Sequence, residues 1–108
     1  MERSIIIYTL SDPITNEIKY IGKTTYSLSK RLAGHIYDST RRFKNKNYKW
    51  IQSLAKKGLK PVIEILEEIS SIDWEFWECY YISLFKSWGF ELTNTSAGGE
   101  FLGKFKTK

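Results

Sequence analysis

The chain has 108 residues and a mass of 12.7 kDa, the size of a single domain, and we expect residues 1–108 to form one unit. Its hydrophobic content of 42% excludes a disordered polypeptide. The net charge of +5 favours a polyanionic partner, although charge alone does not separate nucleic acid from a membrane surface. A single cysteine, Cys79, and a single histidine, His35, exclude a disulfide framework and a metal site rich in Cys or His.

The first two predicted elements are strands. Residues 4–10 form a β-branched and aromatic run that ends at Ser11-Asp12-Pro13, a typical turn sequence. Residues 18–22 form a second short run of the same kind. The simplest arrangement of these two strands is an antiparallel hairpin with a longer loop.

Two helices are predicted next. Ser27 is a suitable N-cap for a helix that extends to about residue 39, with Leu28, Leu32 and Ile36 on one stripe. Asn47 is the predicted N-cap of a second helix, which ends near Gly58.

The remaining elements are a strand and a helix. We predict a third strand at residues 61–69. Residues 70–73 resemble a capping box, which predicts the start of a helix that ends at residues 88–89. The apolar stripe predicted for this helix consists of Trp74, Trp77, Tyr81, Leu84, Phe85 and Trp88. The order ββααβα predicts an α+β fold, with a three-stranded antiparallel sheet flanked by helices.

Charge is segregated along the chain. Residues 39–63 contain eight basic residues and no acidic one, whereas residues 64–78 contain six acidic residues and no basic one. Such runs form either a solvated face or a surface for a charged partner. Residues 1–7 do not resemble a secretory signal, and no apolar run is long enough to cross a membrane. We therefore expect a cytoplasmic protein without a membrane partner.

Several familiar sites are absent from the sequence. Gly22-Lys23-Thr24 resembles the end of a phosphate-binding loop, but that motif requires glycine where Glu17 stands. Cys79 lies in an apolar helical context, which favours a buried, inert thiol over a nucleophile.

A scattered set of polar residues has a recognisable order. Ile6-Ile7-Tyr8 and Tyr20-Ile21-Gly22 are separated by eleven residues, and Arg31-x-x-x-His35 follows on the first helix. Glu78 lies on the last helix, and Asn94 begins an Asn-x-Ser-x-Gly-Gly loop. Over about residues 5–100 this set resembles the GIY-YIG nuclease superfamily, whose fold is also a three-stranded antiparallel sheet with flanking helices. Ile6 replaces the first glycine of the name motif, which we expect to alter packing more than chemistry.

The resemblance implies hydrolysis of DNA phosphodiester bonds with one divalent cation, Mg²⁺ or Mn²⁺. Glu78 would hold the metal, Arg31 would stabilise the transition state, and Tyr8 would act as general base. Tyr20 and His35 would orient or relay the proton, and Asn94 would support the site. For Tyr8 to act at neutral pH, the metal and Arg31 must lower its pKa, which is near 10 in free tyrosine.

The basic residues would contact the DNA backbone without reading sequence. The candidates are Lys23, Arg41, Arg42, Lys44, Lys46 and Lys49. Two alternatives remain open: a catalytically weak or silent nucleic-acid-binding module of the same fold, and a basic adaptor for an acidic protein. We expect no separate DNA-binding module within 108 residues, so a nuclease of this kind would be a catalytic fragment, a stand-alone enzyme of low specificity, or one that relies on a separate targeting module or protein.

Overall fold

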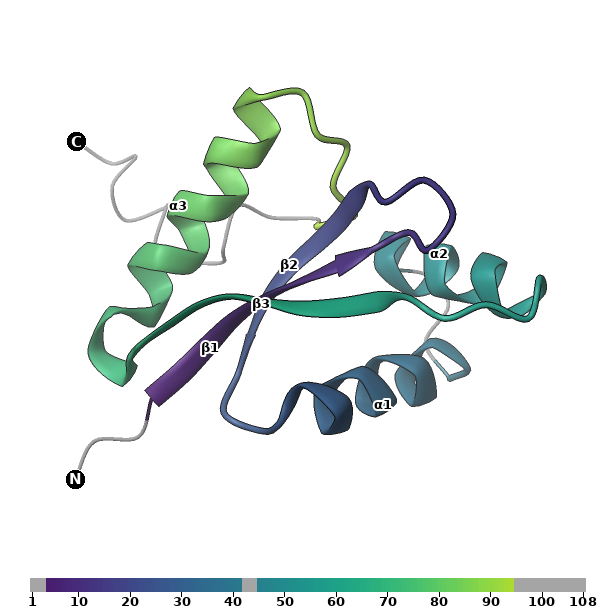
Figure 1. Cartoon of the computed structure of the whole chain (residues 1–108), viewed down its shortest axis with the longest axis horizontal. Coiled ribbons are helices and arrows are strands. Elements are labelled where there is room, and N and C mark those ends of the chain that lie inside the picture. Colours follow the sequence, from purple (N-terminus) through teal and green to yellow (C-terminus); the bar gives the residue numbers. More distant parts are fainter. Residues whose placement is uncertain (1–3, 42–44, 95–108) are drawn as a thin grey trace.

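The computed structural model describes residues 4–41 and 45–94, and the element order in this part of the chain is the predicted one. The fold is a small α+β arrangement of three antiparallel strands and three α-helices, as predicted (Figure 1). The elements are β1 (Ser4–Ser11), β2 (Ile18–Thr24), α1 (Leu28–Ser39), α2 (Lys46–Ala55), β3 (Val62–Ser70), a 3₁₀ turn (Ser71–Asp73) and α3 (Trp74–Ser87).

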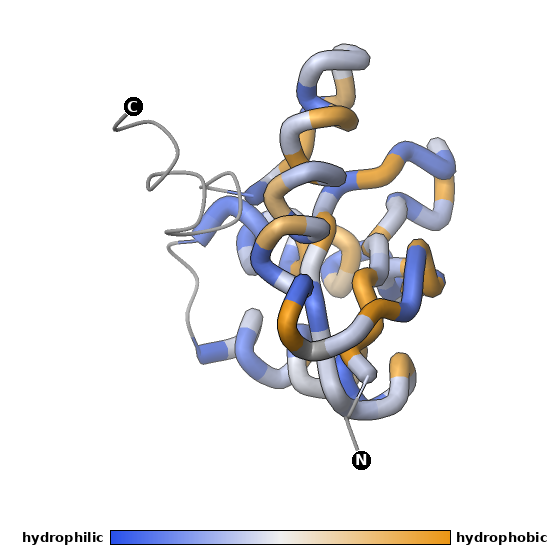
Figure 2. Tube along the Cα trace, turned by 90° about the vertical axis from the view of Figure 1, so that its left-hand side faces the viewer, coloured by the Kyte–Doolittle hydropathy of each residue, from blue (hydrophilic) through white to orange (hydrophobic). Residues whose placement is uncertain are grey.

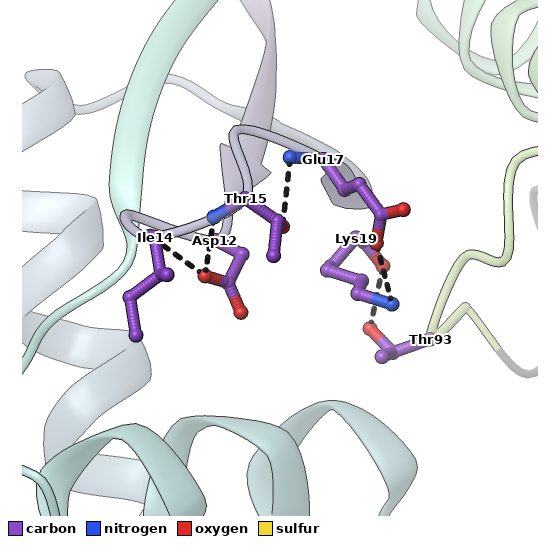
Figure 3. Close-up of polar contacts among 6 residues, drawn as sticks. All are labelled: Asp12, Ile14, Thr15, Glu17, Lys19 and Thr93. Atoms are coloured by element: carbon purple, nitrogen blue, oxygen red, sulfur yellow. Dashed lines mark hydrogen bonds and ion pairs between the residues drawn. The ribbon is translucent and has the colours of Figure 1, made fainter.

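The sheet has the strand order β2-β1-β3, so β1 is central and pairs antiparallel with both neighbours. The hairpin between β1 and β2 is closed by a polar turn, shown in Figure 3. The Asp12 carboxylate accepts hydrogen bonds from the backbone N–H groups of Ile14 and Thr15, at 2.8 and 3.1 Å. Asn16 completes the turn with a positive φ of 65°, a conformation that asparagine tolerates better than most residues.

The two faces of the sheet carry different helices, because side chains alternate along each strand. Ile5 and Ile7 of β1 pack with Ile82 and Phe85 of α3. Tyr8 and Leu10 form a cluster with Ile51 of α2, and residues of α1 pack against it. Figure 1 shows α3 on one side of the sheet and α1 and α2 on the other. We call these the α3 face and the α1–α2 face.

Two predicted helix starts are wrong. Helix α2 begins two residues earlier than expected, with Asn45 rather than Asn47 as N-cap; the Asn45 side chain accepts from the Asn47 N–H at 2.7 Å. At the predicted capping box, residues 70–73, neither Ser70 nor Asp73 makes a side-chain cap hydrogen bond, and a 3₁₀ turn leads into α3 instead. Ser27 does cap α1, as predicted.

The end of α3 also differs from prediction. Trp88 was expected on the buried stripe, but 63% of it is exposed, and its ring stacks on Phe85 from outside. Cys79 is buried, as predicted. In the described residues no helix is long and apolar enough to cross a membrane, and Figure 2 shows hydrophilic and hydrophobic residues intermixed along the chain.

Candidate active site

Three rings meet on the α1–α2 face. Tyr8 of β1 and Tyr20 of β2 lie with their ring centroids 6.2 Å apart, and His35 of α1 approaches them edge-on at 5.8 and 5.2 Å. Tyr8 is fully buried and His35 is only 2% exposed. Residues far apart in the sequence therefore form one aromatic cluster at the centre of the fold, as the predicted site requires.

The Tyr8 hydroxyl has two polar partners, and both come from α1. Arg31 Nε donates to it at 3.0 Å, and His35 Nε2 lies 2.6 Å away. The two partners are four residues apart, so they occupy neighbouring turns on one side of the helix. The structure thus brings Tyr8, Arg31 and His35 into direct contact around a single oxygen atom.

Gly22 makes the close approach of the rings sterically feasible. It lies opposite Tyr8 in the β1–β2 register. A Cβ atom at this position would lie 2.6 Å from the Tyr8 hydroxyl and 2.7 Å from the Tyr20 ring, closer than real Cβ contacts allow. The glycine of the Tyr20-Ile21-Gly22 motif is therefore required by packing around the site. Ile6, the first residue of the Ile6-Ile7-Tyr8 motif, is partly buried against the same cluster, so its side chain contributes to packing.

Burial dominates the electrostatics of Tyr8. It raises the pKa of the phenol well above 10, the neighbouring Tyr20 adds to the rise, and Arg31 opposes it. We expected Arg31 to help lower this pKa, but in the protein alone its charge does not overcome the loss of hydration. At neutral pH the hydroxyl of Tyr8 is therefore protonated.

His35 is shifted in the opposite sense. Burial, assisted by the charge of Arg31, lowers the pKa of His35 to about 4. The imidazole is consequently neutral at pH 7, and one of its two nitrogens has a free lone pair. A neutral imidazole beside a protonated phenol can accept the phenolic proton.

Glu78 reaches the site electrostatically from α3. Its carboxylate raises the pKa values of both Tyr8 and Tyr20, after the larger effect of burial on each tyrosine. Burial raises the pKa of Glu78 itself, whereas Lys23 opposes this rise. Among residues 4–41 and 45–94 no hydrogen bond or ion pair engages the carboxylate. Glu78 is thus a half-buried carboxyl group that makes no hydrogen bond or ion pair to a described residue, with Lys23 close enough to act on it electrostatically.

Asn94 joins the segment after α3 to the site. Its side-chain oxygen accepts from the Ile21 N–H at 3.0 Å, and its nitrogen donates to the Ile21 carbonyl at 2.8 Å. Ile21 stands between Tyr20 and Gly22, so Asn94 holds the middle of the second motif. The glycine-rich part of the predicted loop, residues 95–100, lies outside the described residues.

Sequence reasoning missed Asn47, which it took for a helix cap. The residue is 3% exposed, and its amide Nδ2 lies 3.4 Å from His35 Nδ1. The amide Oδ1 accepts from the Thr93 hydroxyl at 3.0 Å. Asn45 and Asn47 are both suitable caps, and only the position of His35 on the other helix distinguishes them. No local signal in the sequence could have shown this contact.

The predicted DNA contacts are dispersed. Lys23 lies over the Trp74 ring, 4.4 Å from its centroid, and its charge acts on Glu78. Lys46 is exposed at the first residue of α2, next to Asn47. Arg41 bonds the Tyr37 hydroxyl beyond the end of α1, and Lys49 is exposed on α2. The structure therefore brings Lys23 into electrostatic reach of Glu78. Arg42 and Lys44 lie outside the described residues.

The residues that gather at this site have the chemistry of proton transfer and anion binding. They supply a phenol, a neutral imidazole, a permanent cation and a carboxylate without a described partner. No family model, no curated protein and no solved structure matches the chain. A functional proposal for this chain therefore depends on the geometry of these residues.

Proposed function

We propose that the chain is a divalent-metal-dependent endodeoxyribonuclease of the GIY-YIG type that acts in the cytoplasm. The observation that carries the proposal is the Tyr8 hydroxyl, which is in contact with both Arg31 Nε and His35 Nε2. Hydrolysis of a phosphodiester requires a group that takes a proton from water and a cation that binds the phosphate. One oxygen atom with these two neighbours meets both requirements.

Proton transfer would run from water to Tyr8 and from Tyr8 to His35. The pKa of Tyr8 is raised, so a free phenolate is scarce at pH 7. The neutral imidazole 2.6 Å away offers a lone pair that can take the phenolic proton as the hydroxyl takes one from the attacking water. This coupling makes His35, in place of a free phenolate, the final proton acceptor, and the burial and Arg31 charge that lower the pKa of His35 to about 4 oppose the transfer.

Arg31 would bind the phosphate with the rest of its guanidinium group. Its Nε is occupied by Tyr8, while Nη1 and Nη2 make no hydrogen bond to any described residue. Two parallel N–H donors match two phosphate oxygens in a bidentate arrangement. The same side chain would therefore place the scissile phosphate next to the Tyr8 hydroxyl.

Glu78 would hold the Mg²⁺ or Mn²⁺ ion. No group of three or more His, Cys, Asp or Glu side chains forms a metal cage within residues 4–41 and 45–94. A single half-buried carboxylate nevertheless fits Mg²⁺, which commonly keeps several waters and takes its remaining ligands from substrate phosphates. When bound, such an ion supplies positive charge that stabilises the leaving oxygen.

One observation favours the alternative of a silent nucleic-acid-binding module. The burial that raises the pKa of Tyr8 would leave a poor base if His35 did not accept its proton. Such a module would still bind DNA through exposed basic side chains such as Lys46 and Lys49. Binding of this kind weakens steeply with salt, so it can be measured independently of cleavage.

Incubation with DNA in Mg²⁺ and in EDTA tests the proposal directly. Supercoiled, linear, branched and single-stranded DNA should be supplied in parallel, because the site does not specify a DNA structure. We expect Mg²⁺-dependent cleavage of at least one form and none in EDTA. A salt-sensitive mobility shift without cleavage would select the binding module, and absence of binding would contradict both functions and favour an adaptor for an acidic protein.

A further inference from the structure

Both ring nitrogens of His35 face polar groups inside the protein. Nε2 lies 2.6 Å from the Tyr8 hydroxyl, and Nδ1 lies 3.4 Å from the side-chain amide of Asn47. His35 and Asn47 are 2% and 3% exposed, so neither side chain can exchange its partner for bulk water. The proton on the neutral imidazole must therefore be placed on one of these two nitrogens.

The hydrogen atoms around Tyr8 decide which nitrogen it is. Arg31 Nε has only a hydrogen to offer, so the Tyr8 oxygen accepts from it at 3.0 Å. The phenolic hydrogen then needs an acceptor, and within the described residues His35 Nε2 is the one that lies within hydrogen-bonding distance. Nε2 accordingly has the free lone pair, and in a neutral imidazole Nδ1 has the hydrogen.

An Nδ1–H group cannot be paired with the amide nitrogen of Asn47, because both atoms are donors. A second conflict exists on the other side of the amide. Thr93 has one hydroxyl hydrogen, but both the Lys19 carbonyl, at 2.8 Å, and Asn47 Oδ1, at 3.0 Å, lie in front of it. Figure 3 shows Thr93 against the backbone of Lys19. The oxygen and nitrogen of an asparagine amide have nearly the same shape, and the hydrogen-bond network decides between them.

Exchanging the two amide atoms removes both conflicts. Asn47 Oδ1 then accepts from His35 Nδ1–H, and Asn47 Nδ2 donates to the Thr93 oxygen, whose hydrogen goes to the Lys19 carbonyl. Each contact in the chain from Arg31 Nε to the Lys19 carbonyl now joins one donor to one acceptor. A paired buried network is the expected state, since leaving a buried donor or acceptor unpaired is destabilising.

We propose that Asn47 is a positioning residue whose amide oxygen holds neutral His35 in the Nδ1–H tautomer and so keeps Nε2 free for the proton of Tyr8. Its catalytic consequence rests on the proposed function, whereas the tautomer itself does not. Asn47 would thereby couple the start of α2, and through Thr93 the edge strand β2, to the reacting hydroxyl.

The chain contains a single histidine, so the tautomer can be read without ambiguity. Long-range ¹H–¹⁵N correlation spectra of the labelled wild-type protein at pH 7 should show a protonated Nδ1 and an unprotonated Nε2. A protonated Nε2 would overturn the proposal. This measurement needs neither DNA nor metal, so a protein that shows the expected tautomer and cuts no DNA would contradict the proposed function alone.

Two variants test whether Asn47 is responsible. Asn47→Leu removes the acceptor of Nδ1–H, so each tautomer then leaves one buried hydrogen unpaired, on Nδ1 or on the Tyr8 hydroxyl. We therefore expect the Nε2–H tautomer to appear beside the Nδ1–H tautomer, and the kcat of DNA cleavage to fall ~10-fold or more with KM little changed. Asn47→Asp keeps an acceptor and should keep Nδ1 protonated. Asn45→Asp adds the same charge two residues earlier, at a cap that aspartate also serves, and is the matched control.

The variants remain informative if one of them is unstable. Should Asn47→Leu fail to fold, the Asn47→Asp spectrum and the wild-type spectrum still decide the matter, because both predict a protonated Nδ1. A folded Asn47→Leu protein that retains the wild-type tautomer would show that Asn47 does not control His35.

Discussion

The two faces of the sheet differ in the kinds of side chain that they bury. On the α3 face, buried isoleucines of the strands pack against Ile82 and Phe85 in an entirely apolar cluster. On the α1–α2 face, the same central strand buries Tyr8, with its hydroxyl bonded to two side chains of α1. His35 and Asn47 are buried beside it. The buried residues of the α3 face thus pack without directed bonds, with a Tyr81–Glu67 hydrogen bond beside them, whereas the other face buries a chain of directed hydrogen bonds.

The difference matters because a buried polar network is a costly way to stabilise a protein. An apolar core of similar volume would tolerate substitution better and would need no exact pairing of donors and acceptors. Burial of Tyr8, His35 and Asn47 is therefore better explained by the proposed chemistry than by stability. Variants that separate rate from stability are the appropriate way to test this contrast.

We expect the largest effect on DNA cleavage from a substitution of Glu78, which lies on α3. Glu78→Ala should abolish cleavage while the fold and DNA binding are retained, because it removes the proposed metal ligand and alanine favours the helix. Cleavage assays in Mg²⁺ together with circular dichroism check this. Glu75→Ala, on the same helix, is the matched control and should keep its activity. Full activity in Glu78→Ala would refute the metal assignment.

Adjacent residues of β1 allow the two faces to be compared directly. Tyr8→Phe keeps the ring but breaks both hydrogen bonds, so we expect the rate to fall by ~10² to 10⁴ and the free energy of unfolding by about 1–3 kcal/mol. Ile7→Ala should cost about 2–5 kcal/mol of stability with little change in the rate per folded molecule. Wild-type cleavage by Tyr8→Phe would make Tyr8 a packing residue.

Arg31→Lys should reduce the cleavage rate by ~10²-fold although the charge is kept. The three donors of lysine share one nitrogen, so they cannot reproduce the planar fork in which Nε contacts Tyr8 while both Nη atoms face the phosphate. Single-turnover rates at saturating enzyme measure this loss. Arg41→Lys, beyond the end of α1, is the matched control and should cut normally. If both variants cut alike, Arg31 only attracts DNA.

The smallest expected effect is on stability as a function of pH. The pKa of His35 is about 4 in the folded protein and near 6.5 in an unfolded chain, so between these values the unfolded state binds more protons. The free energy of unfolding should therefore decrease as the pH falls from 7 to 4. Glu78, with its raised pKa, acts in the opposite sense and offsets part of this decrease.

Urea unfolding monitored by the fluorescence of the four tryptophans can measure this dependence. His35→Gln removes the titrating group, so its free energy of unfolding should decline less between pH 7 and 4 than that of the wild type. The comparison of slopes cancels the general loss of stability caused by the substitution. Equal slopes would mean that His35 is not buried in its neutral form.

Local patterns in the sequence were sufficient for the elements and their order. Side chains repeat with a different period in a helix and in a strand. The β-branched run of β1 therefore indicates a strand, and the four-residue spacing of Leu28, Leu32 and Ile36 indicates a helix. The same spacing correctly put Arg31 and His35 on one side of α1. These predictions concern residues that are close together in the sequence, so the local pattern is enough to make them.

Only the tertiary structure decided which side chains of the site are hydrogen-bonded to one another and how their pKa values are shifted. Asn45 and Asn47 are equivalent as caps in the sequence, and Asn47 differs only because His35 of another helix lies against it. Likewise the pKa of Tyr8 is raised rather than lowered because burial of the ring, followed by the electrostatic effect of Tyr20, outweighs the opposing charge of Arg31. Both outcomes depend on which side chains are in contact across the sheet and on how much water those contacts exclude. Such contacts join segments that are far apart in the sequence. The periodicity of residues along the chain therefore does not predict them.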